Sequence, residues 1–197
     1  MKIVLGIDEA GRGPLAGPVA VGVVATDPTF DILAVFKGLN DSKKLSPKKR
    51  EALYELLVAE GKKGNVRAKV CFASEKLIDR KGIAYAVRDA LMRGVRALSP
   101  EPLGVKIYLD GSLKAPPEYE QETVIGGDAT IPSIMLASIA AKVARDRLML
   151  TLAKRYPKYG FEVHKGYGTK AHYAALHAHG FCPIHRKSFI HLGKNAG

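Results

Sequence analysis

The sequence predicts an α/β domain in which a mixed five-stranded sheet is flanked by helices. Short apolar runs rich in β-branched residues alternate with longer segments of helical periodicity. The chain has 197 residues, of which 47% are hydrophobic and 25% charged, enough for one large core. We find no repeat, linker or low-complexity segment. A single domain is therefore expected over residues 1–197, with a core over about 1–155 and a C-terminal extension over about 156–197.

The first part of the chain predicts a hairpin followed by a helix. Residues 2–8 and 18–25 are apolar strands, and the glycine-rich stretch between them is short enough to connect an antiparallel pair. After a polar loop, Ser46 is typical of a helix N-cap and Pro47 of a first helical position. We expect this helix to continue to about Glu60, where Gly61 ends it. Its inward residues should be Ala52, Leu53, Leu56 and Leu57.

The middle of the chain predicts three more strands and a second helix. The helix covers residues 83–98, where apolar side chains keep helical spacing until the prolines at 100 and 102. The strands are expected at residues 66–73, 105–109 and 122–125.

Two further helices follow. One begins near Pro132 and runs to about Arg155, and the other covers residues 169–179 and closes at Gly180. Residues 158–168 between them read as a loop. The buried stripe of the long helix should be Ile134, Ala137, Ala141, Ala144, Leu148 and Leu152.

Charge and cysteine content narrow the class of protein. The chain has 31 Lys and Arg against 19 Asp and Glu, and residues 142–197 alone hold 11 against 2, together with all six histidines. This uneven excess indicates a polyanion-binding surface. Two cysteines do not make a disulfide or zinc framework. No apolar run is long enough to span a membrane, and no signal peptide opens the chain. We expect a cytoplasmic monomer that does not bind a membrane, whose histidines are scattered singly rather than gathered as zinc ligands.

Three predicted strands lead into acidic residues beside glycine. Asp8 and Glu9 follow the first strand, Asp110 ends the fourth, and Asp128 follows the fifth. Ligands bind at one edge of such sheets, and four carboxylates gathered there would repel one another unless a cation neutralised them. Mg²⁺ or Mn²⁺ suits such a site, and two ions could hydrolyse a phosphodiester. Any one acid alone could instead cap a loop, but three such strand ends in a basic protein favour the metal site.

Seven motifs together resemble the type 2 ribonucleases H, the ribonuclease HII family. They follow in one order over nearly the whole chain. The most specific is Asp-Glu-Ala-Gly-Arg-Gly-Pro-Leu-Ala-Gly-Pro at residues 8–18, and the others lie at residues 41–45, 109–111, 127–128, 137–147, 164–172 and 185–189.

The resemblance implies a ribonuclease H-like fold and a metal-dependent endonuclease. Such an enzyme hydrolyses the RNA strand of RNA–DNA hybrids. It also incises 5′ of single ribonucleotides embedded in duplex DNA, which supports their removal. Two Mg²⁺ or Mn²⁺ ions are implied, with 5′-phosphate and 3′-hydroxyl products. The catalytic and metal-binding residues carried over are Asp8, Glu9, Asp110 and Asp128.

The resemblance also implies substrate contacts. The turn of Gly11, Arg12 and Gly13 matches the family's sensor of the ribose 2′-hydroxyl, the group that distinguishes RNA from DNA. Tyr167 matches a tyrosine that stacks on the neighbouring deoxyribose, and Lys43 lies in a family motif beside other basic residues.

Several assignments stay open at this point. Arg145, Arg147, Arg186 and Lys187 are expected to contact the duplex backbone. Asp146 either pairs with Lys142 one helical turn away or acts near the metals. The alternative from another class is a basic protein that binds hybrid or structured nucleic acid without cleaving it.

Overall fold

The computed structural model describes residues 3–190 and contains a mixed five-stranded sheet with the strand order β3-β2-β1-β4-β5. The central strand β1 pairs antiparallel with β2 and parallel with β4. β3 pairs antiparallel with β2, and β5 pairs parallel with β4. The strands are β1 (Ile3–Ala10), β2 (Val19–Thr26), β3 (Val66–Ala73), β4 (Val105–Asp110) and β5 (Glu120–Val124). The mixed sheet confirms the predicted fold class.

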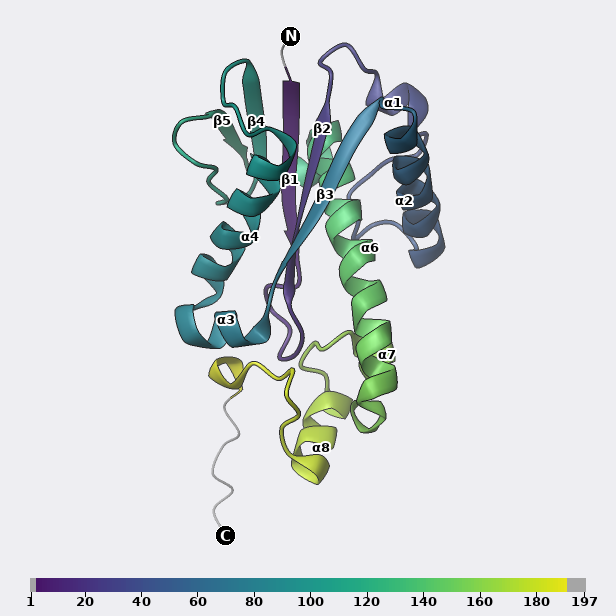
Figure 1. Ribbon diagram of the computed structural model, residues 1–197. Coiled ribbons are helices and arrows are strands. Elements are labelled where there is room, and N and C mark those ends of the chain that lie inside the picture. The colour runs from purple at the N-terminus through teal and green to yellow at the C-terminus, as the bar shows by residue number, and fades with distance from the viewer. Residues whose placement is uncertain (1–2, 191–197) are drawn as a thin grey trace.

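Helices cover both faces of this sheet (Figure 1). The α-helices are α1 (Ile32–Val35), α2 (Pro47–Lys62), α3 (Glu75–Lys81), α4 (Ile83–Leu98), α5 (Gly127–Thr130), α6 (Pro132–Arg155), α7 (Phe161–His164) and α8 (Lys170–His179). Two 3₁₀ turns, η1 (Pro157–Tyr159) and η2 (Lys187–Phe189), lie in the C-terminal part. None of the helices within residues 3–190 combines the length and apolar character that a membrane crossing needs.

The two faces carry separate apolar cores. On one face α4 packs on β1, β2 and β3, with Ile7, Val23 and Leu91 fully buried. On the other face α6 lies against β1 and β2, and α2 packs on α6. Helix α6 lies very close to the strands, because a β-carbon at Gly6 or Gly22 would come within 2.1 or 2.2 Å of the α6 backbone. These glycines place α6 directly beside the carboxyl end of β1.

The predicted helices and strands are present, but several details differ. β1 continues to Ala10, so Asp8 and Glu9 lie inside a strand that stays paired with β2. β5 ends at Val124, and Asp128 sits in α5 rather than directly after a strand. The predicted loop at 158–168 contains η1 and α7, and α1 and α3 were not predicted.

The predicted inward faces of α2 and α6 hold only in part. Ala52 is exposed on α2, whereas Leu53 and Leu57 are buried as expected. In α6 the predicted buried residues Ile134, Ala137 and Ala141 are indeed buried. In the second half of the helix the predicted Ala144, Leu148 and Leu152 are only half-buried. The buried residues there are Arg145, Met149 and Ala153. The buried face shifts because the first half of α6 packs on the sheet and the second half on the C-terminal segments.

Candidate active site

Sheet register brings acidic side chains from separate parts of the chain together. β1 and β4 are parallel neighbours with Ile7 paired to Leu109, so the next residues, Asp8 and Asp110, project beside each other. Asp128 arrives from the first turn of α5, which follows β5. One carboxylate oxygen from each of Asp8, Asp110 and Asp128 lies within 4.8 Å of the others. Three of the four predicted ligands therefore meet at the carboxyl edge of the parallel strands.

Burial makes this group of carboxylates electrostatically unfavourable on its own. Asp8 and Asp128 are buried, and Asp110 is half-buried. Burial raises the pKa of Asp8 to about 7, and the charges of Glu9 and Asp110 act in the same direction. Lys43 neutralises part of this negative charge, because its Nζ lies 2.8 Å from Asp128 Oδ2. That hydrogen bond raises the pKa of Lys43. A bound cation would relieve the remaining repulsion.

Glu9 lies on the other face of β1. Alternate residues of a strand point to opposite faces, and Glu9 shares the α4 side with Ile7. Its carboxylate accepts a hydrogen bond of 3.3 Å from Arg12. Burial raises the pKa of Glu9, and the charge of Asp110 adds to the rise. Among residues 3–190 the close group of ligand atoms consists of the three aspartates without Glu9.

The turn after β1 presents an exposed tip on a buried base. Arg12 and Gly13 are exposed, whereas Gly11 is buried. Gly11 has φ +90°, and a β-carbon there would lie 1.9 Å from Nε of Arg145. This position therefore requires glycine both for its backbone conformation and for its close contact with an arginine.

Two buried arginines hold this turn from below. The guanidinium of Arg186 donates to the carbonyl oxygens of Gly11, Arg12 and Gly17 at 2.7–2.8 Å. Arg145 donates to the carbonyls of Ala16, Pro18 and Lys165 at 3.0–3.2 Å. Both side chains are almost completely buried, so the prediction that they contact duplex phosphates is wrong. Their planar guanidinium groups instead donate hydrogen bonds to backbone carbonyls inside the protein.

Arg147, also expected to contact the duplex, forms ion pairs with two acids of α2. Its guanidinium lies 3.0 Å from Glu51 and 2.5 Å from Glu55. Lys142 and Asp146 form the ion pair that their spacing on the helix allowed, with Lys142 Nζ 2.9 Å from Asp146 Oδ1.

Tyr167 lies beside the same turn. Its side chain is 44% exposed, and Cζ of Arg145 is 5.9 Å from the ring centroid. The preceding residue, Gly166, accepts a hydrogen bond of 2.8 Å from the backbone N–H of Leu15. The segment that carries Tyr167 is thus joined to the segment that follows Gly13, and both the Tyr167 ring and the Gly13 backbone are exposed.

Sequence reasoning missed two features near this site. Ser42 and Ser138 are buried and share a hydrogen bond of 2.8 Å between their hydroxyls, which links the loop that carries Lys43 to α6. A serine in the apolar stretch of α6 was the available signal. Three histidines expected to be scattered, His164, His172 and His185, lie together in the core of the C-terminal segments. His191 falls outside the described residues.

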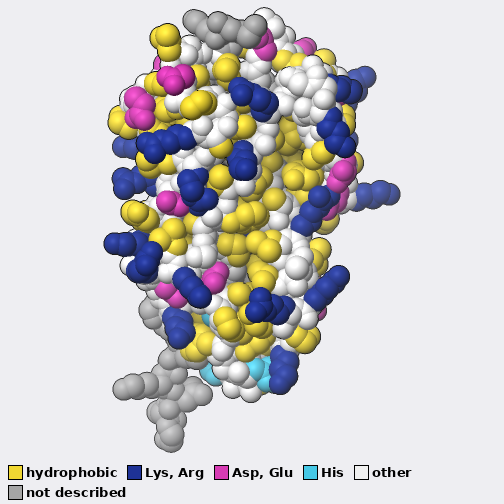
Figure 2. Space-filling model, in the orientation of Figure 1, with side chains coloured by type: hydrophobic (Ala, Val, Ile, Leu, Met, Phe, Trp, Pro, Cys, Tyr) yellow, Lys and Arg dark blue, Asp and Glu magenta, His cyan; other side chains and the backbone are white. Residues whose placement is uncertain are grey.

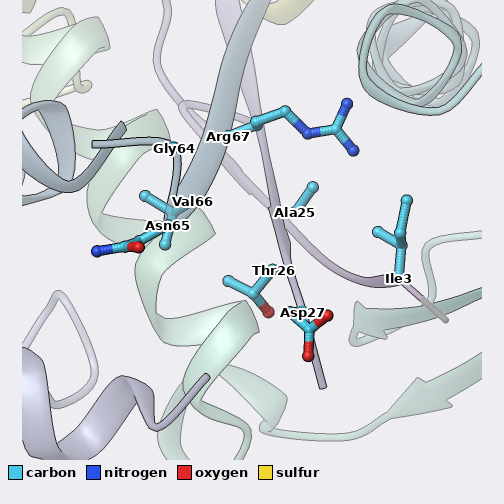
Figure 3. Close-up of a pocket in the computed structure, with 8 residues that line it drawn as sticks. All are labelled: Ile3, Ala25, Thr26, Asp27, Gly64, Asn65, Val66 and Arg67. Atoms are coloured by element: carbon cyan, nitrogen blue, oxygen red, sulfur yellow. The ribbon is translucent and has the colours of Figure 1, made fainter. Parts of the chain in front are cut away.

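A separate pocket lies at the opposite end of β1 (Figure 3). It has a volume of about 260 Å³, and its lining includes Ile3, Asp27 and Arg67. Ile3 begins the strand that carries Asp8 near its other end, so this pocket is distinct from the carboxylate group.

Comparison with known proteins identifies the family. The family model for ribonuclease HII matches residues 5–192. The ribonuclease HII of Coxiella burnetii (strain Dugway 5J108-111) is 46% identical over 188 residues, covering 95% of this chain and 88% of that protein. The chain belongs to the ribonuclease HII family. It is accordingly a type 2 ribonuclease H, a nuclease that acts on RNA–DNA substrates, as the motifs predicted.

Solved structures of the family have the same fold. Ribonuclease H2 from Pyrococcus horikoshii OT3 superposes with a TM-score of 0.74 at 28% identity, covering 94% of this chain and 93% of that one. RNase HII from the PCNA:RNase HII complex of Archaeoglobus fulgidus gives a TM-score of 0.76 at 25% identity, with 98% of each chain covered.

Proposed function

We propose that this enzyme, besides cleaving the RNA strand of hybrids, incises 5′ of single ribonucleotides in duplex DNA. The observation that carries the proposal is the position of three clustered aspartates close to an exposed glycine turn. Asp8 lies only three residues before Gly11, so the groups for cleavage and for recognising a ribose can act on adjacent parts of one nucleotide. The products would be a 3′-hydroxyl and a 5′-phosphate.

The residues present fit two divalent cations. Asp8, Asp110 and Asp128 form an all-oxygen group with their oxygens within 4.8 Å of each other, which suits Mg²⁺ or Mn²⁺. Glu9 would complete the ligand set from the other face of β1. When bound, the ions would activate a water and stabilise the leaving oxygen. A cation at Asp128 would compete with Lys43 for that carboxylate, and we propose that Lys43 then contacts a substrate phosphate.

Substrate recognition is assigned to the turn and to Tyr167. Gly13 has open space around it, since a β-carbon there would meet nothing within 4 Å. A ribose 2′-hydroxyl could therefore approach the backbone of Gly11, Arg12 and Gly13. The exposed ring of Tyr167 could stack on the neighbouring deoxyribose.

Basic side chains line two cavities, one on the α4 side of the sheet and one between α2 and α6, and these support a duplex substrate. A cavity of about 220 Å³ beside Arg12 is also lined by Arg88 and Lys114. A second, of about 460 Å³, is lined on the α6 side by Lys142 and Lys165, among others. Over the face shown in Figure 2, Lys and Arg side chains are spread widely, with fewer acidic side chains among them. We propose that residues 156–190 act as a substrate-binding extension that completes this surface.

The test is cleavage of a DNA duplex that contains one ribonucleotide. With Mg²⁺ or Mn²⁺ we expect one incision 5′ of the ribonucleotide, abolished by chelator and reduced on the order of 1,000-fold by Asp8→Asn, because metal-held charge supplies several kcal/mol of transition-state stabilisation. Cleavage of a full hybrid without incision at a single ribonucleotide would refute the proposal. Binding without any cleavage would favour the non-catalytic alternative.

The role of Tyr167 has its own test. Tyr167→Ala should slow incision at a single ribonucleotide about tenfold, since a stacking contact is worth roughly 1–3 kcal/mol. Tyr173→Ala, at a partly buried tyrosine of the neighbouring helix, controls for a loss of packing alone. An unchanged incision rate in Tyr167→Ala would remove Tyr167 from the substrate-binding set.

A further inference from the structure

The C-terminal segments contain a buried chain of three histidines. His164 ends α7, His172 lies in the first turn of α8, and His185 follows on the returning chain. All three are nearly inaccessible to solvent. The rings of His164 and His172 stack with centroids 4.5 Å apart, and Nε2 of His172 lies 3.0 Å from Nε2 of His185.

Their hydrogen bonds determine where each proton lies. Nδ1 of His172 is 2.9 Å from the carbonyl oxygen of Tyr167. A carbonyl can only accept, so this nitrogen carries the hydrogen and Nε2 of His172 is an acceptor. Nδ1 of His185 accepts from the backbone N–H of Cys182 at 2.9 Å, the shorter of its two contacts with that residue. Nε2 of His185 therefore donates to His172, and one arrangement of neutral rings satisfies every contact except the 3.3 Å approach of His185 Nδ1 to the Cys182 carbonyl, which accepts instead from the backbone N–H of His185.

His164 completes the arrangement in the same way. Its Nε2 donates to the carbonyl of Tyr159 at 2.8 Å, and its Nδ1 accepts from the backbone N–H of Gly166 at 3.2 Å. Its own carbonyl accepts from the N–H of Tyr167 at 2.9 Å. Two histidines thus hold the backbone on both sides of Tyr167.

Packing alone does not require this chain. Apolar rings of similar volume would pack against Phe161 and Tyr159 without three matched tautomers, and buried polar networks are costly unless every member is satisfied. One ring nitrogen of His164 and one of His172 bond the backbone of Gly166 and Tyr167, and this segment carries an exposed tyrosine. The arrangement therefore holds the backbone from which the Tyr167 side chain projects.

We infer that His164 and His172 are positioning residues that aim Tyr167 at the substrate, with His185 fixing the tautomer of His172. The inference rests on the proposed function to the extent that Tyr167 contacts the nucleic acid. His172 itself lies behind the Tyr167 backbone and does not reach the reacting atoms.

Two substitutions of His172 separate positioning from packing. His172→Asn places an amide N–H where Nδ1 lies and keeps the donor for the Tyr167 carbonyl. His172→Gln reaches only the position of Nε2 and leaves that carbonyl without its donor. Both remove the ring, so both should lower thermal stability similarly. We expect His172→Gln to slow single-ribonucleotide incision about tenfold, the same loss as for Tyr167→Ala, and His172→Asn to stay within about threefold of wild type.

A double-mutant cycle shows whether His172 acts through Tyr167. On a Tyr167→Ala background, His172→Gln should cause no further loss of rate. Equal losses in the Asn and Gln variants, or a full additional loss in the double mutant, would overturn the inference. A Tyr167→Ala enzyme with unchanged rate would instead refute the proposed role of Tyr167 itself.

The wild-type protein provides a readout that does not depend on activity. In ¹⁵N NMR spectra at neutral pH, His172 should be in the Nδ1–H tautomer, the less common form of a free histidine, while His164 and His185 are in the Nε2–H form. An Nε2–H tautomer at His172 would contradict the inference even if the variants fail to fold.

Discussion

At the scale of single residues, we expect Gly11 to be needed for folding and Gly13 for substrate recognition. Gly11→Ala should lower the free energy of unfolding by roughly 1–3 kcal/mol, because φ is +90° and the new methyl group would collide with Arg145. Gly13→Ala should leave stability within about 0.5 kcal/mol, since its surroundings are open. If the ribose approaches this turn, Gly13→Ala will still slow incision. Urea denaturation and cleavage assays on both variants test this, and a fully active Gly13→Ala enzyme would contradict close approach.

Arg186 provides a second prediction at this scale. Its fork reaches three carbonyl groups, and burial, reinforced by the charge of Arg145, lowers its pKa to about 9. Arg186→Lys keeps a charge but cannot reproduce the fork, so we expect a loss of about 2–4 kcal/mol of unfolding free energy. Arg147→Lys is the control, because its ion pairs are exposed and should be worth less than about 1 kcal/mol. Equal losses of stability in the two variants would contradict the conclusion that Arg186 stabilises the turn through its three hydrogen bonds.

Sequence patterns predicted the carboxylate group better than the side chains that support it. Asp8 and Asp110 lie toward the ends of apolar strands and Asp128 lies four residues beyond one, so a pattern on the chain predicts their meeting point. Arg145 and Arg186 look like solvent-facing cations, because basic side chains in a positively charged protein are usually exposed. Their burial depends on the chain returning from residue 185 to cover the Gly11 turn, and no local pattern reports that contact.

At the scale of elements, the packing of α6 on β1 and β2 locates the site. Gly22→Ala would place a methyl group 2.2 Å from the carbonyl oxygen of Ala137, so it should cost about 3 kcal/mol or more and displace α6 from the carboxylates. Gly61→Ala, in the last turn of α2, meets nothing closer than 3.6 Å and should be neutral or stabilise by up to about 1 kcal/mol. Thermal unfolding of both variants is the measurement, and a stable, active Gly22→Ala enzyme would contradict the packing described.

The positions of helices and strands were more predictable than the side of each helix that is buried. Ser46 caps α2 as expected, since its side chain accepts from the backbone N–H three residues on. Thr169, predicted as the first residue of its helix, caps α8 in the same way. The buried side of α6 was predicted only for its first half. A single stripe assumes one packing partner, whereas α6 meets the sheet first and the C-terminal segments later.

At the scale of the whole molecule, the histidine chain makes attachment of the C-terminal segments sensitive to acid. Burial lowers the pKa of His185 to about 4, and the facing rings of His172 and His164 act in the same direction. The other titratable groups near it are Cys182 and Tyr159. An unfolded histidine titrates near 6.5, so the unfolded state binds more protons between those values. Stability is fully present above pH ~6.5 and falls toward pH ~4, by on the order of 3 kcal/mol.

His185→Gln tests this linkage, because the amide retains an N–H for His172 and does not titrate. The loss of unfolding free energy between pH 7 and pH 4.5 should be smaller in this variant than in wild type. His177→Gln, at an exposed position of α8, should behave like wild type. Identical pH dependence in all three proteins would show that His185 does not contribute.

The central claim is that three aspartates from separate segments form one divalent-metal site, and direct Mn²⁺ binding tests it best. Calorimetric titration should show saturable binding in wild type and in Asp146→Asn, whose carboxylate pairs with Lys142. The same titration should show binding lost or strongly weakened in Asp8→Asn, Asp110→Asn and Asp128→Asn, each tested for an unchanged fold by circular dichroism. Unaltered Mn²⁺ binding in these three variants would contradict the account.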